Sequence, residues 1–157
     1  MSKASIDAID RKILQHLIRN ARMPFLEIAR ECGISGAAIH QRVKKMEESG
    51  VIRGFRLEVD PTALGYNVSA MIGIRINDPS MNFEIVDGLR RIPEVVECHF
   101  VTGKYNIWTR VYCVDHEHLM HTILDHILRV PGVSETETFI SLSDSFGRQV
   151  SVRDLDQ

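Results

Sequence analysis

Several side chains between residues 35 and 49 could bind nucleic acid if this stretch forms a helix. Ile39, Val43 and Met46 recur at helical spacing and give it one apolar side. At about 100° per residue, the opposite side carries small, hydrogen-bonding and cationic residues: Ala37, His40, Gln41, Lys44 and Lys45, with Arg42 on the flank. Amides and imidazoles can hydrogen-bond base edges, and lysines can contact phosphates. This pattern indicates a recognition surface, although an isolated basic helix face is usually only solvated.

The surrounding residues favour the recognition surface, because residues 24–50 read as two short helices joined by a glycine turn. Pro24 suits the first turn of a helix, and Gly33 can adopt the left-handed conformation that ends one. Ser35 is a candidate N-cap for the second helix. This arrangement is typical of a helix-turn-helix, which places its second helix in the major groove of double-stranded DNA. The predicted DNA-contacting residues are Ser35, Ala37, His40, Gln41, Arg42, Lys44 and Lys45.

The composition indicates a globular protein of one or two small domains. The chain has 157 residues, 44% of them hydrophobic, and no apolar run approaches the roughly 18 residues of a membrane span. The N-terminus lacks the apolar block of a signal peptide, so we expect a cytoplasmic protein that does not bind membranes. Three cysteines without a C-x-x-C pair argue against a disulfide framework or a zinc knuckle.

Charge is distributed unevenly along the chain. Residues 1–58 hold 11 Lys and Arg against 7 Asp and Glu, a net of +4, whereas residues 59–157 hold 8 against 14, a net of −6. We therefore expect only the N-terminal part to meet nucleic acid. Because +4 is modest, useful affinity should require paired copies.

The chain divides into three predicted segments: a helix-turn-helix domain at 1–50, a strand linker at 51–66 and a second domain at 67–157. A first helix is expected to start at Ser5 or Asp7 and to supply the third wall of the N-terminal domain. Residues 51–59 alternate apolar with polar, as a half-buried strand does. Asp60-Pro61 and Leu64-Gly65 then provide turns.

The C-terminal half contains an internal repeat whose two prolines, Pro93 and Pro131, lie 38 residues apart. Each repeat reads as strand, helix, strand: 67–76, 82–91 and 95–102, then 106–114, 116–129 and 133–142. The helices should pack through Ile85, Leu89, Leu119, Ile123 and Ile127. Two such units give βαββαβ, so the predicted class is α+β with a ferredoxin-like sheet that has both helices on one face.

The other face of that sheet must meet water or a partner. In the third strand, Trp108, Arg110 and Tyr112 alternate with the apolar side. Because Trp and Tyr rarely lie together on an exposed sheet, we expect a second sheet to pack here, which gives a homodimer. Single surface aromatics remain the alternative.

The sequence disfavours two other classes of function, a metal-binding protein and an enzyme. His118, His121 and Asp125 fall on one face of the last helix and could hold a metal, but their spacing matches no complete ligand set, so we expect no metal. An enzyme is disfavoured because the sequence shows no nucleophile beside a base, no paired carboxylates in an apolar setting and no phosphate-binding glycine loop. We therefore expect no catalytic residues and no cofactor.

Several short motifs resemble those of the Lrp/AsnC family, the feast/famine regulators of bacteria and archaea. They are residues 10–14 (DRKIL), 20–22 (NAR), 33–35 (GIS), 42–43 (RV), 50–52 (GVI), 64–65 (LG) and 101–105 (VTGKY). Asn20-Ala21-Arg22, Ile39-His40 and Thr136-Glu137-Thr138 look closest to the AsnC branch. The resemblance covers nearly the whole chain. It implies a winged helix-turn-helix joined to a ferredoxin-like domain that dimerises, assembles into octamers and binds an amino-acid effector between dimers, and hence a transcriptional regulator.

The resemblance also implies an effector site in the turn Thr102-Gly103-Lys104-Tyr105-Asn106, facing Thr136 and Thr138 of a neighbouring dimer. Without the family, this turn would read only as a good hairpin. Asn106 departs from the family, much of which carries Asp there. An amide offers both donor and acceptor, so we expect asparagine or glutamine as effector, with leucine and methionine behind. On this view Asn106→Asp would strengthen the binding of simple amino acids through a charged bond to ammonium.

Overall fold

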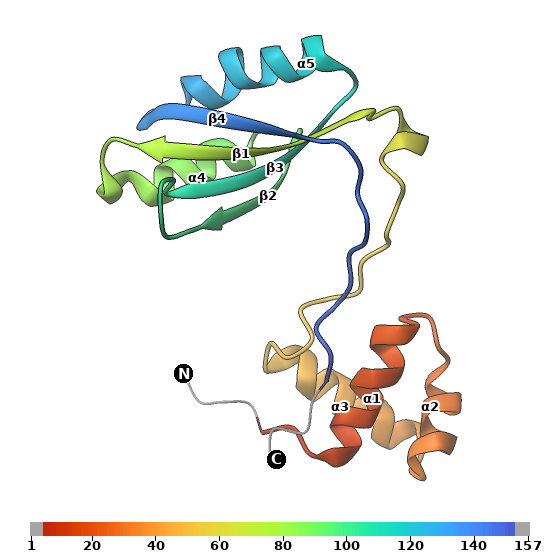
Figure 1. Ribbon diagram of the computed structural model, residues 1–157. Coiled ribbons are helices and arrows are strands. Elements are labelled where there is room, and N and C mark those ends of the chain that lie inside the picture. The colour runs from red at the N-terminus through yellow and green to blue at the C-terminus, as the bar shows by residue number, and fades with distance from the viewer. Residues whose placement is uncertain (1–4, 153–157) are drawn as a thin grey trace. The chain divides into compact units, whose positions relative to one another are not determined.

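The computed structural model describes residues 5–152, which divide into two compact units (Figure 1). One unit comprises residues 5–57 together with residues 146–152. The other runs from Glu58 to Ser145. The change of unit after Leu57 lies within the linker predicted at residues 51–66. None of the described helices combines the length and apolar character that crossing a membrane requires.

The N-terminal unit contains three helices: α1 (Ala8–Arg19), α2 (Phe25–Cys32) and α3 (Gly36–Glu48). Asp7 caps α1 in a capping box with Asp10. Gly33 ends α2 in the left-handed region, at φ 68°, where a Cβ would be strained. Ser35 caps α3 by accepting from the backbone N–H of Ala38 at 3.2 Å. Local sequence thus fixes where each helix begins or ends, and the predicted helix-turn-helix is confirmed.

One apolar core holds these three helices together. Its buried residues come from every helix: Ile13 and Leu17, Ile28 and Ala29, then Ile39, Val43 and Met46. Because the last three repeat at helical period, α3 buries one side and leaves the other in solvent.

Residues 51–59 do not form the predicted strand. Within the described chain they pair with no other segment, and Phe55, Leu57 and Val59 are 47%, 88% and 46% exposed. The alternating pattern is present, but a strand also needs a neighbour for its backbone N–H and C=O groups. The strand prediction is therefore wrong for the single chain.

The C-terminal unit is a four-stranded antiparallel sheet with its helices on one face, and the predicted ferredoxin-like βαββαβ order is confirmed. The elements are β1 (Val68–Ile76), α4 (Asn82–Arg90), β2 (Val95–Phe100), β3 (Ile107–Cys113), α5 (His116–His121) and β4 (Val133–Ser141). Short 3₁₀ turns lie at Thr62–Leu64 and Pro79–Met81. The strands are ordered β2-β3-β1-β4, so β1 and β3 are central.

The two faces of the sheet differ in burial. The helix-covered face of β1 and β3 is fully packed by Ala70, Ile72, Ile74, Ile107 and Val111, against Ile85 and Leu89 of α4. The opposite face, here called the open face, carries Met71, Trp108, Tyr112 and Phe139, which are only partly covered. The open face is therefore the one that a partner could cover.

The helix predicted at 116–129 changes its hydrogen bonding along its length. After α5, residues Thr122–His126 form a π-helical turn and Ile127–Arg129 a 3₁₀ turn. Thr122 is fully buried, whereas Ile123, expected in the core, is only half-buried. The hydroxyl of Thr122 donates to the carbonyl of His118 at 2.9 Å, which satisfies its buried polar group.

Candidate nucleic-acid interface and effector turn

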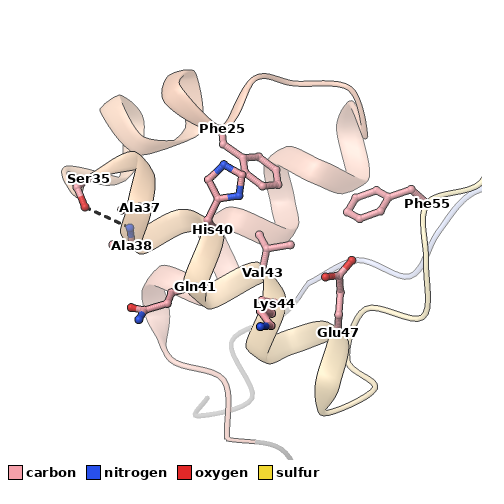
Figure 2. A pocket seen from close by; sticks show the side chains of 10 residues that line it. All are labelled: Phe25, Ser35, Ala37, Ala38, His40, Gln41, Val43, Lys44, Glu47 and Phe55. Atoms are coloured by element: carbon pink, nitrogen blue, oxygen red, sulfur yellow. Dashed lines mark hydrogen bonds between the residues drawn. The ribbon is translucent and has the colours of Figure 1, made fainter.

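The outer side of α3 lines an open groove of about 1060 Å³ (Figure 2). The lining residues are Phe25, Ser35, Ala37, Ala38, His40, Gln41, Val43, Lys44, Glu47 and Phe55. Five of the seven predicted DNA-contacting residues are among them. Lys45 is also exposed on α3. The helix therefore brings most of the predicted residues to one surface.

The side chains on this surface differ in how firmly they are held. The His40 ring lies edge-on against Phe25 of α2, with 4.6 Å between ring centroids and 68° between planes. Gln41 instead points away from the three helices in Figure 2, and the Lys44 side chain is 75% exposed. The nearest carboxylate to Lys44 is Glu48, at 3.9 Å between two exposed groups, which is too weak a pair to hold the lysine. Gln41 and Lys44 can thus adjust to a ligand.

Arg42 lies on the inner flank of α3 and is bound within the unit. Its Nη1 donates to Asp7 Oδ2 at 2.7 Å and to Asp10 Oδ1 at 2.8 Å, so it ties α3 to the capping box of α1. The bonds to Asp10 and Asp7 raise the pKa of Arg42. The pKa of Asp7 is lowered, first by the backbone N–H of Asp10 and then by Arg42. The sequence placed Arg42 among the DNA contacts, but these bonds direct its guanidinium away from that role.

The turn at residues 102–106 is fixed to β1 by Asn106. Asn106 donates its backbone N–H to the carbonyl of Ile74 at 3.0 Å, and its carbonyl accepts from Val101 at 3.0 Å. Its side-chain Oδ1 accepts from the backbone N–H of Ile76 at 3.1 Å. This last bond lies where the pairing of β1 with β4 shifts register, between Arg75 and Ile76. Asn106 therefore satisfies a backbone group at an irregular point of the sheet.

Tyr105 anchors the other side of the turn. Its ring covers Gly73 so closely that a Cβ built on Gly73 would lie 2.6 Å from two ring atoms. The ring centroid is 5.8 Å from Trp108, which is in turn 5.5 Å from Phe139. These aromatic contacts place Tyr105 on the open face, and they require glycine at position 73.

Lys104 contacts the Glu137 carboxylate of β4 and lies over the Tyr105 ring at 5.0 Å. Thr136 and Thr138, also predicted for the effector site, pair with Ile74 and Ile72 and so share the helix-covered face with them. Within one chain, the structure therefore joins the turn to Glu137 and not to the two threonine side chains. The sequence did not point to Glu137, because a strand pattern alone does not tell which side chains of β4 lie on the same face of the sheet as the turn.

The histidines considered for a metal have separate partners. His118 Nδ1 accepts from the backbone N–H of Val114 at 3.2 Å, and its Nε2 is 3.0 Å from Glu94. Both ring nitrogens of His118 thus have partners within the fold, and its side chain is 33% exposed. His121 Nδ1 lies 2.9 Å from Asp125, which raises the pKa of His121. Across residues 5–152, no three His, Cys, Asp or Glu side chains gather closely enough to hold a metal ion.

Each of the two units matches a known protein family. Residues 6–53 match a model described as a winged helix-turn-helix DNA-binding domain, and residues 69–150 match the Lrp/AsnC ligand binding domain. The chain is 35% identical over 150 residues to the regulatory protein AsnC of Escherichia coli, covering 96% of this chain and 99% of AsnC. It is also 35% identical over 140 residues to the HTH-type transcriptional regulator FL11 of Pyrococcus horikoshii, covering 89% and 91%.

Solved structures of related proteins have the same fold as this chain. The structure of E. coli AsnC superposes with a TM-score of 0.85, covering 94% of this chain and 99% of that one. A feast or famine regulatory protein of M. tuberculosis, complexed with L-methionine, gives a TM-score of 0.87 at 28% identity, covering 95% and 100%. The chain belongs to the Lrp/AsnC family. It is a DNA-binding transcriptional regulator with a ligand-binding domain, and not an enzyme.

Proposed function

We propose that this regulator recognises specific DNA sequences through the outer side of α3. The supporting observation is the division of α3 into a fully buried side and an exposed side with adjustable polar groups. Ser35 and Ala37 begin the helix and would lie nearest the base edges, followed by His40 and Gln41. Lys44 and Lys45 would contact phosphates. Arg42 serves in this proposal as a positioning residue that fixes α3 against α1.

Paired copies would bind DNA better than one chain, and the open face offers the pairing surface. Trp108 and Phe139 contact one another there, and Phe139 is 41% exposed in the single chain. A second copy packed on this face would remove apolar and aromatic surface from water. Further assembly of dimers into octamers follows from the resemblance to the family. Sedimentation of the full chain at micromolar concentration tests the assembly, and a folded monomer would contradict it.

The ligand in this proposal is an amino acid bound at the turn of residues 102–106, between dimers. Its support is the match to a ligand-binding domain and the family member complexed with L-methionine. Thr136 and Thr138 would then face the turn of a neighbouring dimer. Gly103, at φ 113°, lets ligand atoms approach the backbone where a side chain would be strained. Asparagine and glutamine lead as ligands, with leucine and methionine behind.

A gel shift with DNA from upstream of the protein's own gene tests the DNA-binding surface. Lys44→Ala should weaken binding to all sequences and reduce the slope of log affinity against log salt by about one, because one phosphate contact is lost. Gln41→Ala and His40→Ala should instead change the preference among sequences. Arg19→Ala, which removes one charge from the exposed end of α1, is the control and should leave the slope unchanged. Unaltered binding in all three α3 variants would refute the assignment.

A further inference from the structure

The orientation of the Asn106 amide determines which of its groups can meet a ligand. The backbone N–H of Ile76 lies 3.1 Å from one end of the amide, and that N–H can only donate. The end facing Ile76 must therefore be the oxygen, because an NH₂ group there would set one donor against another, the N–H of Ile76, with no acceptor between them. The backbone N–H and C=O of Asn106 are also occupied, by Ile74 and Val101. The whole residue is thus held in one orientation.

The other end of the same amide is Nδ2, which carries two N–H donors. No acceptor for Nδ2 is found within residues 5–152, and Asn106 is exposed. In that described part of the chain, the backbone N–H groups of residues 102–105 also have no protein acceptor. An aspartate at 106 could accept from Ile76 equally well, but its second oxygen would be an acceptor. Asparagine therefore presents a donor where aspartate would present an acceptor.

The charges near the turn are already paired. Lys104 contacts Glu137, and Arg75 lies 3.1 Å from Glu135. Each of these carboxylates is thus matched by a cation of the same chain. A ligand ammonium beside the turn would have to compete with Lys104 for Glu137, whereas a ligand oxygen meets donors directly.

We propose that Asn106 binds an oxygen of the effector, a carboxylate or a carboxamide carbonyl, and not its ammonium group. This inference rests on the proposed effector role of the turn. It reverses the expectation drawn from the sequence, in which the amide oxygen accepts from the ligand ammonium, because that oxygen is bound to Ile76. The oxygen that Asn106 binds is either the α-carboxylate, common to all amino acids, or the side-chain carbonyl of asparagine or glutamine.

Asn106→Asp tests the inference through the sign of its effect. The variant keeps an acceptor for Ile76, so the turn should stay folded, and it replaces two donors with a negatively charged oxygen. Calorimetry on the full-length protein with asparagine, glutamine, leucine and methionine should show affinity reduced by about tenfold or more, through loss of a hydrogen bond and repulsion between oxygens. If every ligand binds more weakly, the oxygen that Asn106 binds is the α-carboxylate. If only asparagine and glutamine bind more weakly, it is their side-chain carbonyl.

Asn77→Asp is the matched control, because it adds the same charge one residue after Ile76 on an exposed side chain. It should leave the affinities within about twofold of the original protein. Tighter binding by Asn106→Asp would mean that Asn106 faces the ammonium, which overturns the inference and leaves the effector role of the turn standing. Unchanged binding would mean that Asn106 touches no ligand, which overturns the inference and places the bound amino acid away from this residue. If the original protein binds none of the four amino acids, the effector proposal fails and this inference fails with it.

Discussion

Helix α3 and the turn at residues 102–106 are both exposed elements, yet they separate anchoring from binding in different ways. In α3, anchoring falls to Ile39, Val43 and Arg42 on the inner side, whereas the outer residues Gln41 and Lys44 are exposed and hold no other part of the unit in place. In the turn, Asn106 and Tyr105 anchor the loop and also form its proposed binding surface. A helix has two sides and can divide these tasks, whereas a five-residue turn cannot. Truncating Gln41 should therefore alter DNA recognition without loss of stability, whereas truncating Asn106 should reduce both effector binding and stability.

Removing Arg42 should produce the largest effect. Arg42→Ala leaves Asp7 and Asp10 without their cation, and the Asp10 side chain is only 11% exposed. We expect the free energy of unfolding of the N-terminal unit to fall by about 2–3 kcal/mol, because a nearly buried carboxylate loses its partner. Denaturant unfolding followed by circular dichroism measures this loss.

The same variant distinguishes anchoring from DNA contact. If Arg42 acts only by positioning α3, its removal weakens DNA binding but leaves the salt slope unchanged, unlike Lys44→Ala. Arg42→Lys should recover part of the stability, since one ammonium can replace one of the two bonds. A slope reduced by about one in Arg42→Ala would show that the arginine contacts phosphate after all.

Gly73→Ala should produce the next largest effect, in the C-terminal unit. The added methyl would overlap the Tyr105 ring, so the ring must move off the sheet at a cost of about 1–3 kcal/mol. Trp108 fluorescence should shift, and sedimentation should show smaller assemblies, because the open face is disturbed. Gly147→Ala is the control, because a Cβ at this position would meet no atom within 4 Å. The free energy of unfolding of this variant should change by less than about 0.5 kcal/mol. If Gly73→Ala forms assemblies of the original size, the position of the Tyr105 ring does not affect the surface through which copies pair.

A pair of alanine substitutions makes the smallest and most direct test of the comparison. Asn106→Ala should cost about 1 kcal/mol, because the Ile76 N–H loses its acceptor, and should also weaken effector binding. Gln41→Ala should change DNA preference with a stability change within about 0.5 kcal/mol. Thermal unfolding of both variants measures the difference. Equal stability losses would show that α3 does not divide its tasks.

Much of the fold could be read from the sequence because its signals are local. The apolar stripe of α3, the cap at Ser35 and the glycine stop at Gly33 each depend on a few neighbouring residues. The strand expected at residues 51–59 did not form, because the alternating pattern is a local signal but a strand also needs a partner from elsewhere in the fold.

The contacts that decide the roles of site residues were hidden because they join distant positions. Arg42 meets Asp7 across 35 residues, and Asn106 meets Ile76 across 30. No periodicity marks either pair. The orientation of an amide, and the face on which Glu137 lies, depend on strand register, which the strand pattern alone leaves open.

The π-helical turn at Thr122–His126 has a consequence for how chain length can vary in this family. The N–H of Ile127 bonds the carbonyl of Thr122, five residues back, as well as that of Ile123, and the π-helical turn holds one residue more than an α-helical turn. Leu119 and Ile127 are eight residues apart and would differ by about 80° in a regular α-helix, yet both are buried. Seven residues would bring them within about 20° of each other. A homologue that lacks one residue here could thus keep both side chains in the core with an uninterrupted α-helix, and a one-residue gap in this segment would mark a straightened helix and not a changed fold.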